Sequence, residues 1–290
     1  MVLVLLQFPF VSNVVRAARG EHKVAFTHMP RLYLSPKVLD LALTGDEFDL
    51  DAESSKKIAR VLRMTPGETF VGFSGFGREW ECALTAIETD GKPRVKAVLL
   101  RERDVERLER VRISIAQAIP KGDKMDLVLQ KGTEIGVAEF YPFDAERSVS
   151  RLDPDADYER ATMRAGRYRK IVEGAAAQSG RADVPVVHAI SDFSTAVAGG
   201  TGEGVCFMLD ESEDAPSLRE ILTRDPIEWS DEFPPKVMLL IGPEGGWSPR
   251  EREWGERYGA VAVSLGRRIL RTETAALVAA TILKWEAGEI

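Results

Sequence analysis

Short apolar runs alternate with helical segments from Ile113 to the end of the chain, and this alternation restricts the fold more than any other feature. The runs are rich in Val, Ile, Leu and Phe, as strands buried on both faces are. Segments of helical periodicity separate them, such as 124–136 and a long stretch within 155–179. Buried strands joined by helices predict an α/β fold with a parallel sheet covered on both faces. The predicted strands are 113–119, 137–143, 184–190, 204–210, 236–242 and 260–266.

The preceding part of the chain, from about Arg31 to Lys96, has a strand-rich pattern instead. Residues 68–75 and 78–88 alternate apolar and polar side chains around a glycine-containing turn, which is typical of a β-hairpin. Residues 52–64 have apolar side chains at helical spacing and stop before a Pro-Gly pair. This part of the sequence therefore predicts a small β-rich domain with one helix.

Two further segments are predicted to lie outside the folded domains. Residues 1–28 contain an apolar run shorter than a membrane span of about 20 residues. Their positive charges follow this run, whereas a secretory signal carries them before it. We expect the folded chain to begin near Met29 and the preceding residues to be an extension or a misassigned start. The charged run 101–112 is predicted to be a solvated connector. The predicted divisions of the chain are 1–28, 29–105 and 106–290.

The composition is that of a globular protein without a metal site. Hydrophobic residues make up 44% and charged residues 29% of the chain, which is sufficient for a sizeable core. The net charge of -7 gives no global basic field, so a nucleic-acid partner requires a local patch. Cys82 and Cys206 are too few for a disulfide framework, and the three histidines do not complete a zinc-ligand pattern. We expect a reducing, cytoplasmic location.

Ligands of a parallel α/β sheet bind at the carboxyl ends of its strands, and three such ends carry unusual loops. The first loop is 242–246, in which Gly245 and Gly246 permit positive φ and leave backbone amides open to a ligand. A capping box follows it, with Ser248 as the N-cap and Glu251 three residues on. The glycines alone are equally consistent with a tight turn that binds nothing.

The second loop follows the last predicted strand and contains Arg267, Arg268 and Arg271. Thr272 is predicted to cap the last helix, with Glu273 in its first turn. Three arginines within five residues beside a buried helix favour a functional role over simple surface charge. The helix is rich in alanine and apolar on nearly all sides, so it must be buried against its own domain or a second subunit.

The third loop, residues 208–212, contains an acidic pair that either faces a ligand or caps the following helix. The glycine fingerprint of nicotinamide-binding proteins, the phosphate-binding P-loop and the G-x-S-x-G nucleophile elbow are all absent from the sequence. The three loops therefore suit a nucleoside-like ligand that backbone groups hold.

A basic run, residues 160–170, contains no carboxylate although the protein as a whole is acidic. Such a run can bind phosphates, and Tyr168 is predicted to be available for stacking on a base. The alternative is an exposed helix face that nearby acids balance. The predicted RNA contacts are Arg164, Arg167, Tyr168, Arg169 and Lys170, with Arg147 beside them and a weaker patch at Arg60 and Arg63.

Five segments taken together resemble the RsmE-type ribosomal RNA methyltransferases of the SPOUT superfamily. LLIGPEGGWSPRE and SLGRRILRTETAAL are similar to the two hallmark segments of this family, and three further segments match in the same order. The resemblance covers roughly residues 29–290. The matching segments are 119–137, 146–151, 167–181, 239–251 and 264–277.

The resemblance implies a SPOUT-type parallel sheet with a C-terminal trefoil knot, preceded by a small PUA-like β-barrel that grips RNA. It also implies a homodimer that binds S-adenosyl-L-methionine in the knot loops. Lys56, Lys57, Tyr168 and Ala177 depart from the family's usual residues but leave the cofactor loops intact. The cofactor contacts carried over are Leu209, Gly242, Glu244, Gly245, Gly246, Leu265, Gly266, Ile269, Leu270 and Thr274.

The reaction that the resemblance implies is methylation of N3 of one uridine in small-subunit ribosomal RNA, either free or in the assembled subunit. Uridine N3 carries a proton on its Watson–Crick edge, so the base must be unpaired or splayed out. We expect Arg271 to stabilise negative charge on the uracil oxygens. Glu273 or Glu244 is the candidate base, and helix capping or loop positioning is the alternative role of each.

Two other functions stay open from the sequence. The first is a non-catalytic RNA-binding ribosome assembly factor that keeps the SPOUT fold, against which the intact cofactor loop argues. The second is a SPOUT methyltransferase that acts on another RNA, such as the ribose of a transfer RNA. The combination of an N-terminal barrel with LRTETA disfavours this second function. A nicotinamide oxidoreductase is least favoured because its phosphate loop is missing.

Overall fold

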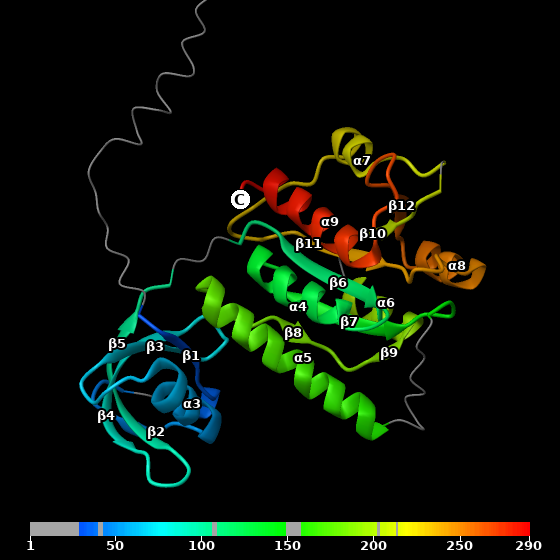
Figure 1. Ribbon diagram of the computed structural model, residues 1–290. Helices are drawn as coiled ribbons and strands as arrows, with labels where there is room; N and C mark the ends of the chain where they lie inside the picture. The colour runs from blue at the N-terminus through cyan, green and yellow to red at the C-terminus, as the bar shows by residue number, and fades with distance from the viewer. Residues whose placement is uncertain (1–28, 40–42, 106–108, 149–157, 202–203, 213) are drawn as a thin grey trace, which may run out of the picture. The chain divides into compact units, whose positions relative to one another are not determined.

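The computed structural model contains two β-sheets with separate cores (Figure 1). It describes residues 29–290 apart from 40–42, 106–108, 149–157, 202–203 and 213, so the predicted extension 1–28 lies outside the described residues. Arg31–Ile290 form one compact unit. The domain boundary predicted near residue 105 therefore stays a prediction, although the two sheets lie on either side of it in the sequence.

The first sheet has the strand order β1-β3-β4-β5-β2, in which β1 is parallel to β3 and the other neighbours are antiparallel. The predicted hairpin is confirmed as β3 and β4, and Gly75 and Gly77 in its turn have φ values of 84° and 77°. The predicted connector is wrong at its start, because Arg101 lies within β5 and pairs with β4. The strands are β1 (Arg31–Tyr33), β2 (Glu47–Asp49), β3 (Thr69–Phe73), β4 (Glu79–Glu88) and β5 (Arg94–Arg103).

The helix predicted over 52–64 forms, but it changes from an α-helix to a π-helix along its length. It begins as α3 (Ala52–Lys56), which Asp51 caps, and continues as the π-helix η1 (Lys57–Leu62). The turn ends at Arg63, a non-glycine residue with a left-handed φ of 54°. A shorter helix, α2 (Pro36–Leu39), precedes it. The predicted helix was therefore correct in place but not in hydrogen-bond pattern.

The second sheet is parallel throughout and follows the order β12-β10-β11-β6-β7-β8, with β9 paired to β7. This confirms the predicted α/β fold with a parallel sheet. The strand predicted over 184–190 was too long, since β8 has only two residues. The strands are β6 (Arg112–Ala118), β7 (Glu139–Asp144), β8 (Val186–Val187), β9 (Ser191–Asp192), β10 (Val205–Leu209), β11 (Lys236–Ile241) and β12 (Val261–Val263).

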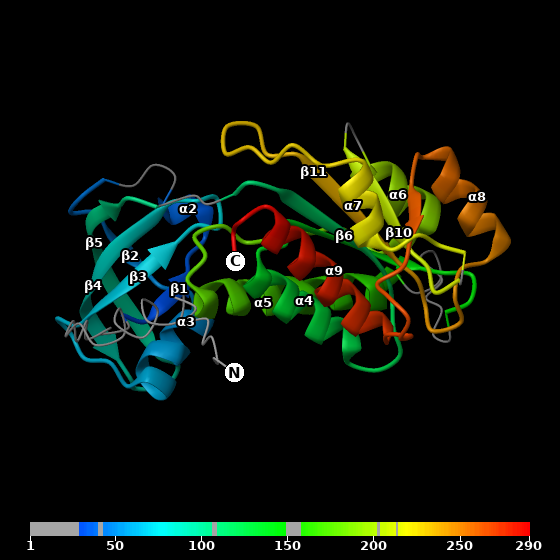
Figure 2. The ribbon, with the colours of Figure 1, turned by 90° about the horizontal axis from the view of Figure 1, so that it is seen from above.

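Helices cover both faces of this second sheet (Figures 1 and 2). Alternate residues of β11 show the two faces: Val237, Leu239 and Ile241 belong to one core, and Met238 and Leu240 to the other. The first core includes side chains of α4, α5, α7 and α9, and the second includes side chains of α6 with α8 packed against it. The helices are α4 (Lys124–Ile135), α5 (Tyr158–Ser179), α6 (Phe193–Thr201), α7 (Leu218–Arg224), α8 (Pro249–Arg257) and α9 (Thr272–Glu286).

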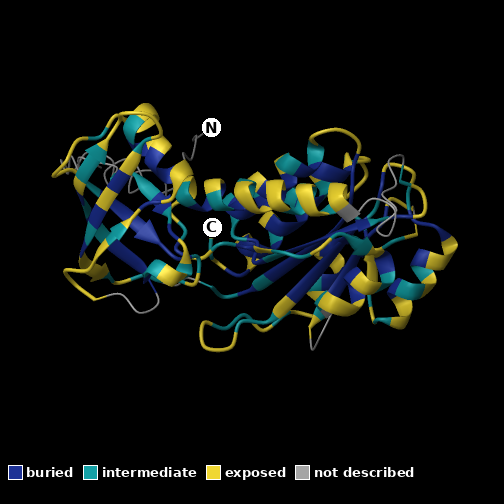
Figure 3. Cartoon of the chain, turned by 90° about the horizontal axis from the view of Figure 1, so that it is seen from below, coloured by how far each residue is buried: buried dark blue, intermediate teal, exposed yellow. Residues whose placement is uncertain are grey.

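Burial follows this layered arrangement, with buried strands between helices whose outer faces are exposed (Figure 3). The last helix, α9, buries Ala276, Ala279 and Ala280 against the sheet, while Trp285 is exposed on its other side. Within this chain, the predicted burial of α9 is therefore confirmed for one side of the helix, and the opposite side is exposed. None of the helices in the described part of the chain combines the length and hydrophobicity that a membrane crossing requires.

A buried ion pair anchors the C-terminal end of α9. Lys284 is 2% exposed, and its Nζ lies 2.6 Å from Glu289 and donates to the backbone oxygen of Val111 at 2.9 Å. Glu289 also accepts from the backbone N–H groups of Arg110 and Val111. Because each charge has several partners, the pair ties the chain end to the start of β6.

Candidate functional site

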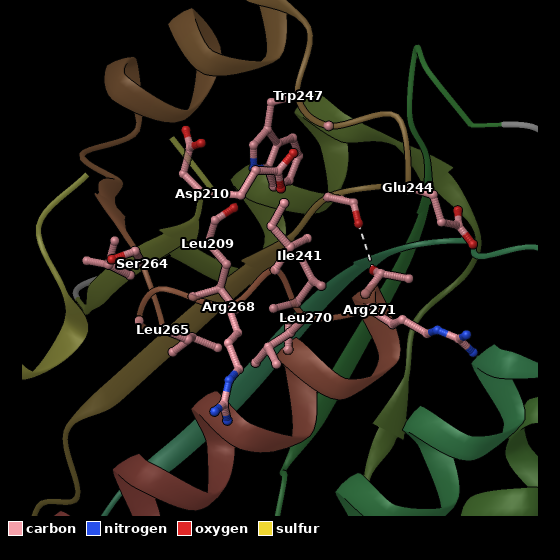
Figure 4. Close-up of a pocket in the computed structure, with 18 of the residues that line it drawn as sticks. Leu209, Asp210, Ile241, Glu244, Trp247, Ser264, Leu265, Arg268, Leu270 and Arg271 are labelled. Atoms are coloured by element: carbon pink, nitrogen blue, oxygen red, sulfur yellow. Dashed lines mark hydrogen bonds between the residues drawn. The ribbon is translucent and has the colours of Figure 1, made fainter. Parts of the chain in front are cut away.

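A pocket of about 310 Å³ lies at the carboxyl ends of β10, β11 and β12 (Figure 4). Three segments line it: residues 209–211, 241–247 apart from Gly245, and 263–272. These are the three strand ends that the sequence singled out, and the sheet order brings them together because β10 lies between β11 and β12. The volume lies at the lower end of the range for small-molecule sites, roughly 300–1,000 Å³.

Trp247 fixes one wall of the pocket. It is 3% exposed, and its indole N–H donates to the backbone oxygen of Leu209 at 2.7 Å, which links the loops after β10 and β11. Gly242 packs against the same ring: a Cβ added there would lie 3.0 Å from it. The glycine at 242 therefore allows close packing of backbone on the indole.

Hydrogen bonds define the turn of the glycine loop. The N–H of Gly246, whose φ is 69°, donates to the backbone oxygen of Pro243 at 3.0 Å. Ser248 and Glu251 form the predicted capping box at the start of α8, which is confirmed. Glu251 also accepts from the N–H of Glu146, so the loop is held by its own helix and by the segment after β7.

Thr272 does not cap α9 through its side chain, so the sequence prediction for it was wrong. Arg271 holds the N-cap position, without a side-chain capping bond. The Thr272 hydroxyl instead donates to the backbone oxygen of Gly242 at 2.7 Å (dashed in Figure 4). It also accepts from Nε2 of Gln117, which is fully buried at the end of β6. One hydroxyl thus joins α9, the loop after β11, and β6.

Charged groups gather at the rim of the pocket where α4 begins. Nζ of Lys124 lies 3.0 Å from Oε1 of Glu244 and 3.6 Å from Oε2 of Glu273. Desolvation raises the pKa of Glu244, but hydrogen bonds from backbone N–H groups and from Lys124 outweigh it and lower the pKa overall. The hydrogen bond to Glu244 raises the pKa of Lys124. Both groups are therefore charged at neutral pH.

Asp210 and Glu211, the acidic pair after β10, both line the pocket. Asp210 is 6% exposed, forms an ion pair with Arg252 and accepts from the N–H of Ser212. The helix-capping alternative for this pair was wrong, because Ser217 caps the following helix. Among the residues described, no three His, Cys, Asp or Glu side chains are grouped as a metal site requires.

The comparisons with known proteins agree on one family. Residues 107–284 match the model of the RNA methyltransferase domain. The ribosomal RNA small subunit methyltransferase E of Bacillus subtilis is 32% identical over 82% of this chain and 90% of its own length. The chain belongs to the ribosomal RNA small subunit methyltransferase E family. The protein of the same name from Mycobacterium bovis is also 32% identical, over 81% of this chain and 85% of its length.

Two solved structures with bound cofactor resemble the chain over most of its length. The family member from Neisseria gonorrhoeae, bound to S-adenosyl methionine, has a TM-score of 0.75 and is 33% identical, covering 89% of this chain and 98% of that one. A putative methyltransferase from Legionella pneumophila, in complex with the same cofactor, has a TM-score of 0.76 and is 29% identical, covering 89% and 97%. The family relationship thus extends to the fold.

Most residues predicted from this family to bind cofactor line the pocket of this chain. Gly245 and Thr274 are the exceptions, and Arg271 lines the pocket whereas Glu273 does not. Those that line it are Leu209, Gly242, Glu244, Gly246, Leu265, Gly266, Ile269 and Leu270. Sequence reasoning missed Trp247 and Gln117 as site-forming residues. Trp247 adjoins the glycine loop and could have been flagged, whereas nothing local marks Gln117.

The predicted RNA contacts on α5 are only partly available. Tyr168 is 4% exposed and lies in the core between α5 and the sheet, which removes the stacking role predicted for it. Arg167 forms ion pairs with Asp123 and Asp126, and Lys170 Nζ lies 2.6 Å from a carboxylate oxygen of Glu53.

The remaining predicted RNA contacts lie on several elements. Arg164 and Arg169 lie on α5, half-buried and exposed respectively. Arg147 donates to the backbone oxygen of Gly245 beside the pocket loop. Arg60 on the π-helix donates to a backbone oxygen of the β4–β5 turn, and Arg63 ends that helix. The structure therefore does not gather the predicted RNA contacts on one helix face.

The substitution Thr272→Val tests the hydrogen bonds that join α9 to the loop after β11. It leaves the Gly242 oxygen and the Gln117 amide without this partner, so the free energy of unfolding should fall by about 1–3 kcal/mol. Urea denaturation measures the change. Thr281→Val is the matched control, because that exposed hydroxyl bonds only to its own helix, at the oxygen of Leu277. Equal losses in the two variants would contradict the joining role.

Proposed function

We propose that this protein transfers a methyl group from S-adenosyl-L-methionine to N3 of a uridine in small-subunit ribosomal RNA. The main observation that supports this proposal is the pocket at the carboxyl ends of β10, β11 and β12. Its lining includes most of the residues expected to contact the cofactor. The names of the relatives support the RNA substrate, and the two cofactor complexes support the methyl donor. A substrate of this kind is consistent with a cytoplasmic location.

The residues present fit such a cofactor. Leu209, Ile241 and Leu265 supply apolar walls that suit an adenine ring, and the glycine loop supplies backbone groups for its polar edge. Gly246 leaves space at the lining where a Cβ would approach Oε1 of Glu211 to 3.3 Å. These residues would hold the cofactor, which when bound supplies a methyl group activated by a positively charged sulfur.

Arg271 and one carboxylate perform the chemistry in this proposal. Arg271 lines the pocket, and within the described residues it forms no ion pair. Its guanidinium is therefore free to stabilise negative charge on the uracil oxygens as the N3 proton leaves. Arg271 and Glu244 extend to the same side of the pocket (Figure 4). The proton acceptor is Glu244 or Glu273. These two carboxylates both lie beside Lys124 at the start of α4.

The two finer structural features implied by the family resemblance are also part of the proposal. We infer that the segment after β12 is threaded as a trefoil knot, which the bond from Thr272 to Gly242 supports by linking α9 to the loop after β11. The five-stranded sheet, within residues 29–105, serves as a PUA-like RNA-gripping domain. A crystal structure of the RNA complex tests both features.

The outer side of α9 supports a homodimer. Trp285 is 69% exposed, and Val278, two turns earlier, is half-buried. Leu127 on the neighbouring α4 is 42% exposed. Exposed large apolar side chains on adjacent helices are typical of an interface with a second subunit.

The variant Gly246→Trp tests the cofactor site. A tryptophan side chain at this position occupies the pocket, so calorimetric titration should show S-adenosyl-L-methionine binding to the wild type and at least tenfold weaker binding to the variant. Gly259→Trp is the control, because Gly259 has a similar φ of 75° but lies in the turn after α8, outside the lining. Absence of binding to the wild type would instead favour a non-catalytic RNA-binding assembly factor.

The variant Arg271→Ala tests charge stabilisation. We expect kcat for methylation of small-subunit ribosomal RNA to fall by roughly 10²–10³, as for other groups that bind a developing anion, while cofactor affinity changes less than about threefold. Radiolabelled methyl transfer and nucleoside analysis for 3-methyluridine are the measurements. Arg257→Ala, on α8 and paired with Glu253, is the control. A methylated nucleoside other than 3-methyluridine would indicate another RNA target.

The variant Trp285→Glu tests the subunit interface. A charge within an apolar interface is costly, so sedimentation should show a dimer for the wild type and a monomer for the variant. Phe233 is similarly exposed, at 77%, but lies outside α9. The control Phe233→Glu should therefore leave the dimer intact. A monomeric wild type at micromolar concentration would contradict the proposal.

A further inference from the structure

Lys124 is the charged group through which α4 reaches the pocket rim. It is the first residue of α4, and its ammonium lies between a carboxylate of the loop after β11 and a carboxylate of α9. The distances are 3.0 Å to Oε1 of Glu244 and 3.6 Å to Oε2 of Glu273. One cation therefore balances two anions that come from separate elements.

The two carboxylates differ in their access to the pocket. The Glu244 side chain is 33% exposed and lines the pocket. The Glu273 side chain is 10% exposed and does not line it, and its Oε2 is buried without a hydrogen-bond partner in the described structure. A buried carboxylate oxygen in this position depends on a nearby cation for compensation, and the ammonium of Lys124 supplies it.

We propose that Lys124 is a positioning residue that holds the Glu244 carboxylate at the pocket rim, while Glu273 is the buried counter-charge that fixes Lys124. This inference rests on the proposed function and assigns the proton acceptor within it. The N3–H bond of uridine breaks and its proton passes to Glu244. The bond from N3 to the methyl carbon forms as the carbon–sulfur bond of S-adenosyl-L-methionine breaks, and that electron pair stays on sulfur.

The arrangement predicts the direction of a pH effect. The pKa of Glu244 is held below its usual value in part by Lys124, so the acceptor is ionised above that pKa and is lost as pH falls through it. Without the ammonium, the negative charges of Glu244 and Glu273 lose their shared cation, and one of the two carboxylates retains a proton to higher pH. In an enzyme without the Lys124 ammonium, the acidic limb of the rate profile therefore moves to higher pH. Other charged groups on these elements are Lys121, whose backbone bonds to Glu244, Asp123 and Asp126, which both pair with Arg167 of α5, Arg147 beside Gly245, and Arg271 at the start of α9.

Single-turnover methyl transfer to small-subunit ribosomal RNA, measured from pH 3.5 to 9 with saturating cofactor, tests the proposal. Lys124→Met should lower the rate at neutral pH at least tenfold and move the acidic limb to higher pH, with cofactor affinity changed less than about threefold. Lys124→Arg should restore most of the rate and the wild-type profile. Lys131→Met, the same change on the same helix at a surface pair with Glu134, should match the wild type.

The carboxylates are separated by a second pair of variants. Glu244→Gln should remove activity across the pH range, whereas Glu273→Gln should retain measurable activity with a shifted profile. A Lys124→Met enzyme with the rate and profile of Lys131→Met would overturn the proposal, as would a larger loss in Glu273→Gln than in Glu244→Gln. A wild type that binds cofactor but methylates no ribosomal RNA would refute the proposed function itself, before any variant is compared.

Discussion

The hydroxyl of Thr272 holds together the elements from which the pocket is built. It donates to Gly242 in the loop after β11 and accepts from Gln117 at the end of β6. Arg271 precedes this residue and Glu273 follows it, so one anchored position directs two charged side chains to different sides of the helix start. Arg271 lies at the pocket, and Glu273 is directed to Lys124 of α4.

Polar contacts at both ends of α9 fix the position of the helix, which the residues in its middle define poorly. The buried residues there are mainly alanines, whose small side chains permit close approach to the sheet but define the position along the helix axis poorly. Thr272 fixes the first turn, and the buried pair of Lys284 and Glu289 fixes the last. The positions of the charged side chains at the pocket therefore depend on directional hydrogen bonds and an ion pair rather than on buried apolar area.

The fold and the position of the site could be predicted because both follow from local patterns. Parallel strands place their carboxyl ends on one edge, so three polar strand ends were enough to locate the pocket. The capping box of Ser248 was predictable because all its partners lie within one turn. The role of Thr272 was not, because its partners are distant in sequence, and a tertiary contact replaced the local cap. The π-helix was missed for a related reason, since apolar spacing does not distinguish it from an α-helix.

Charge runs were the least reliable part of the sequence interpretation, because acids from other segments neutralise part of such a run. The run on α5 loses much of its free charge to acids from elsewhere: Arg167 pairs with two aspartates and Lys170 pairs with Glu53. Within the described residues, no carboxylate forms an ion pair with the arginines of the loop before α9, namely Arg267, Arg268 and Arg271. In a protein of net charge -7, phosphates are attracted to positive charge that remains uncompensated. Under the proposed function, the arginines at the pocket rim therefore remain available to the phosphates of the RNA around the target uridine.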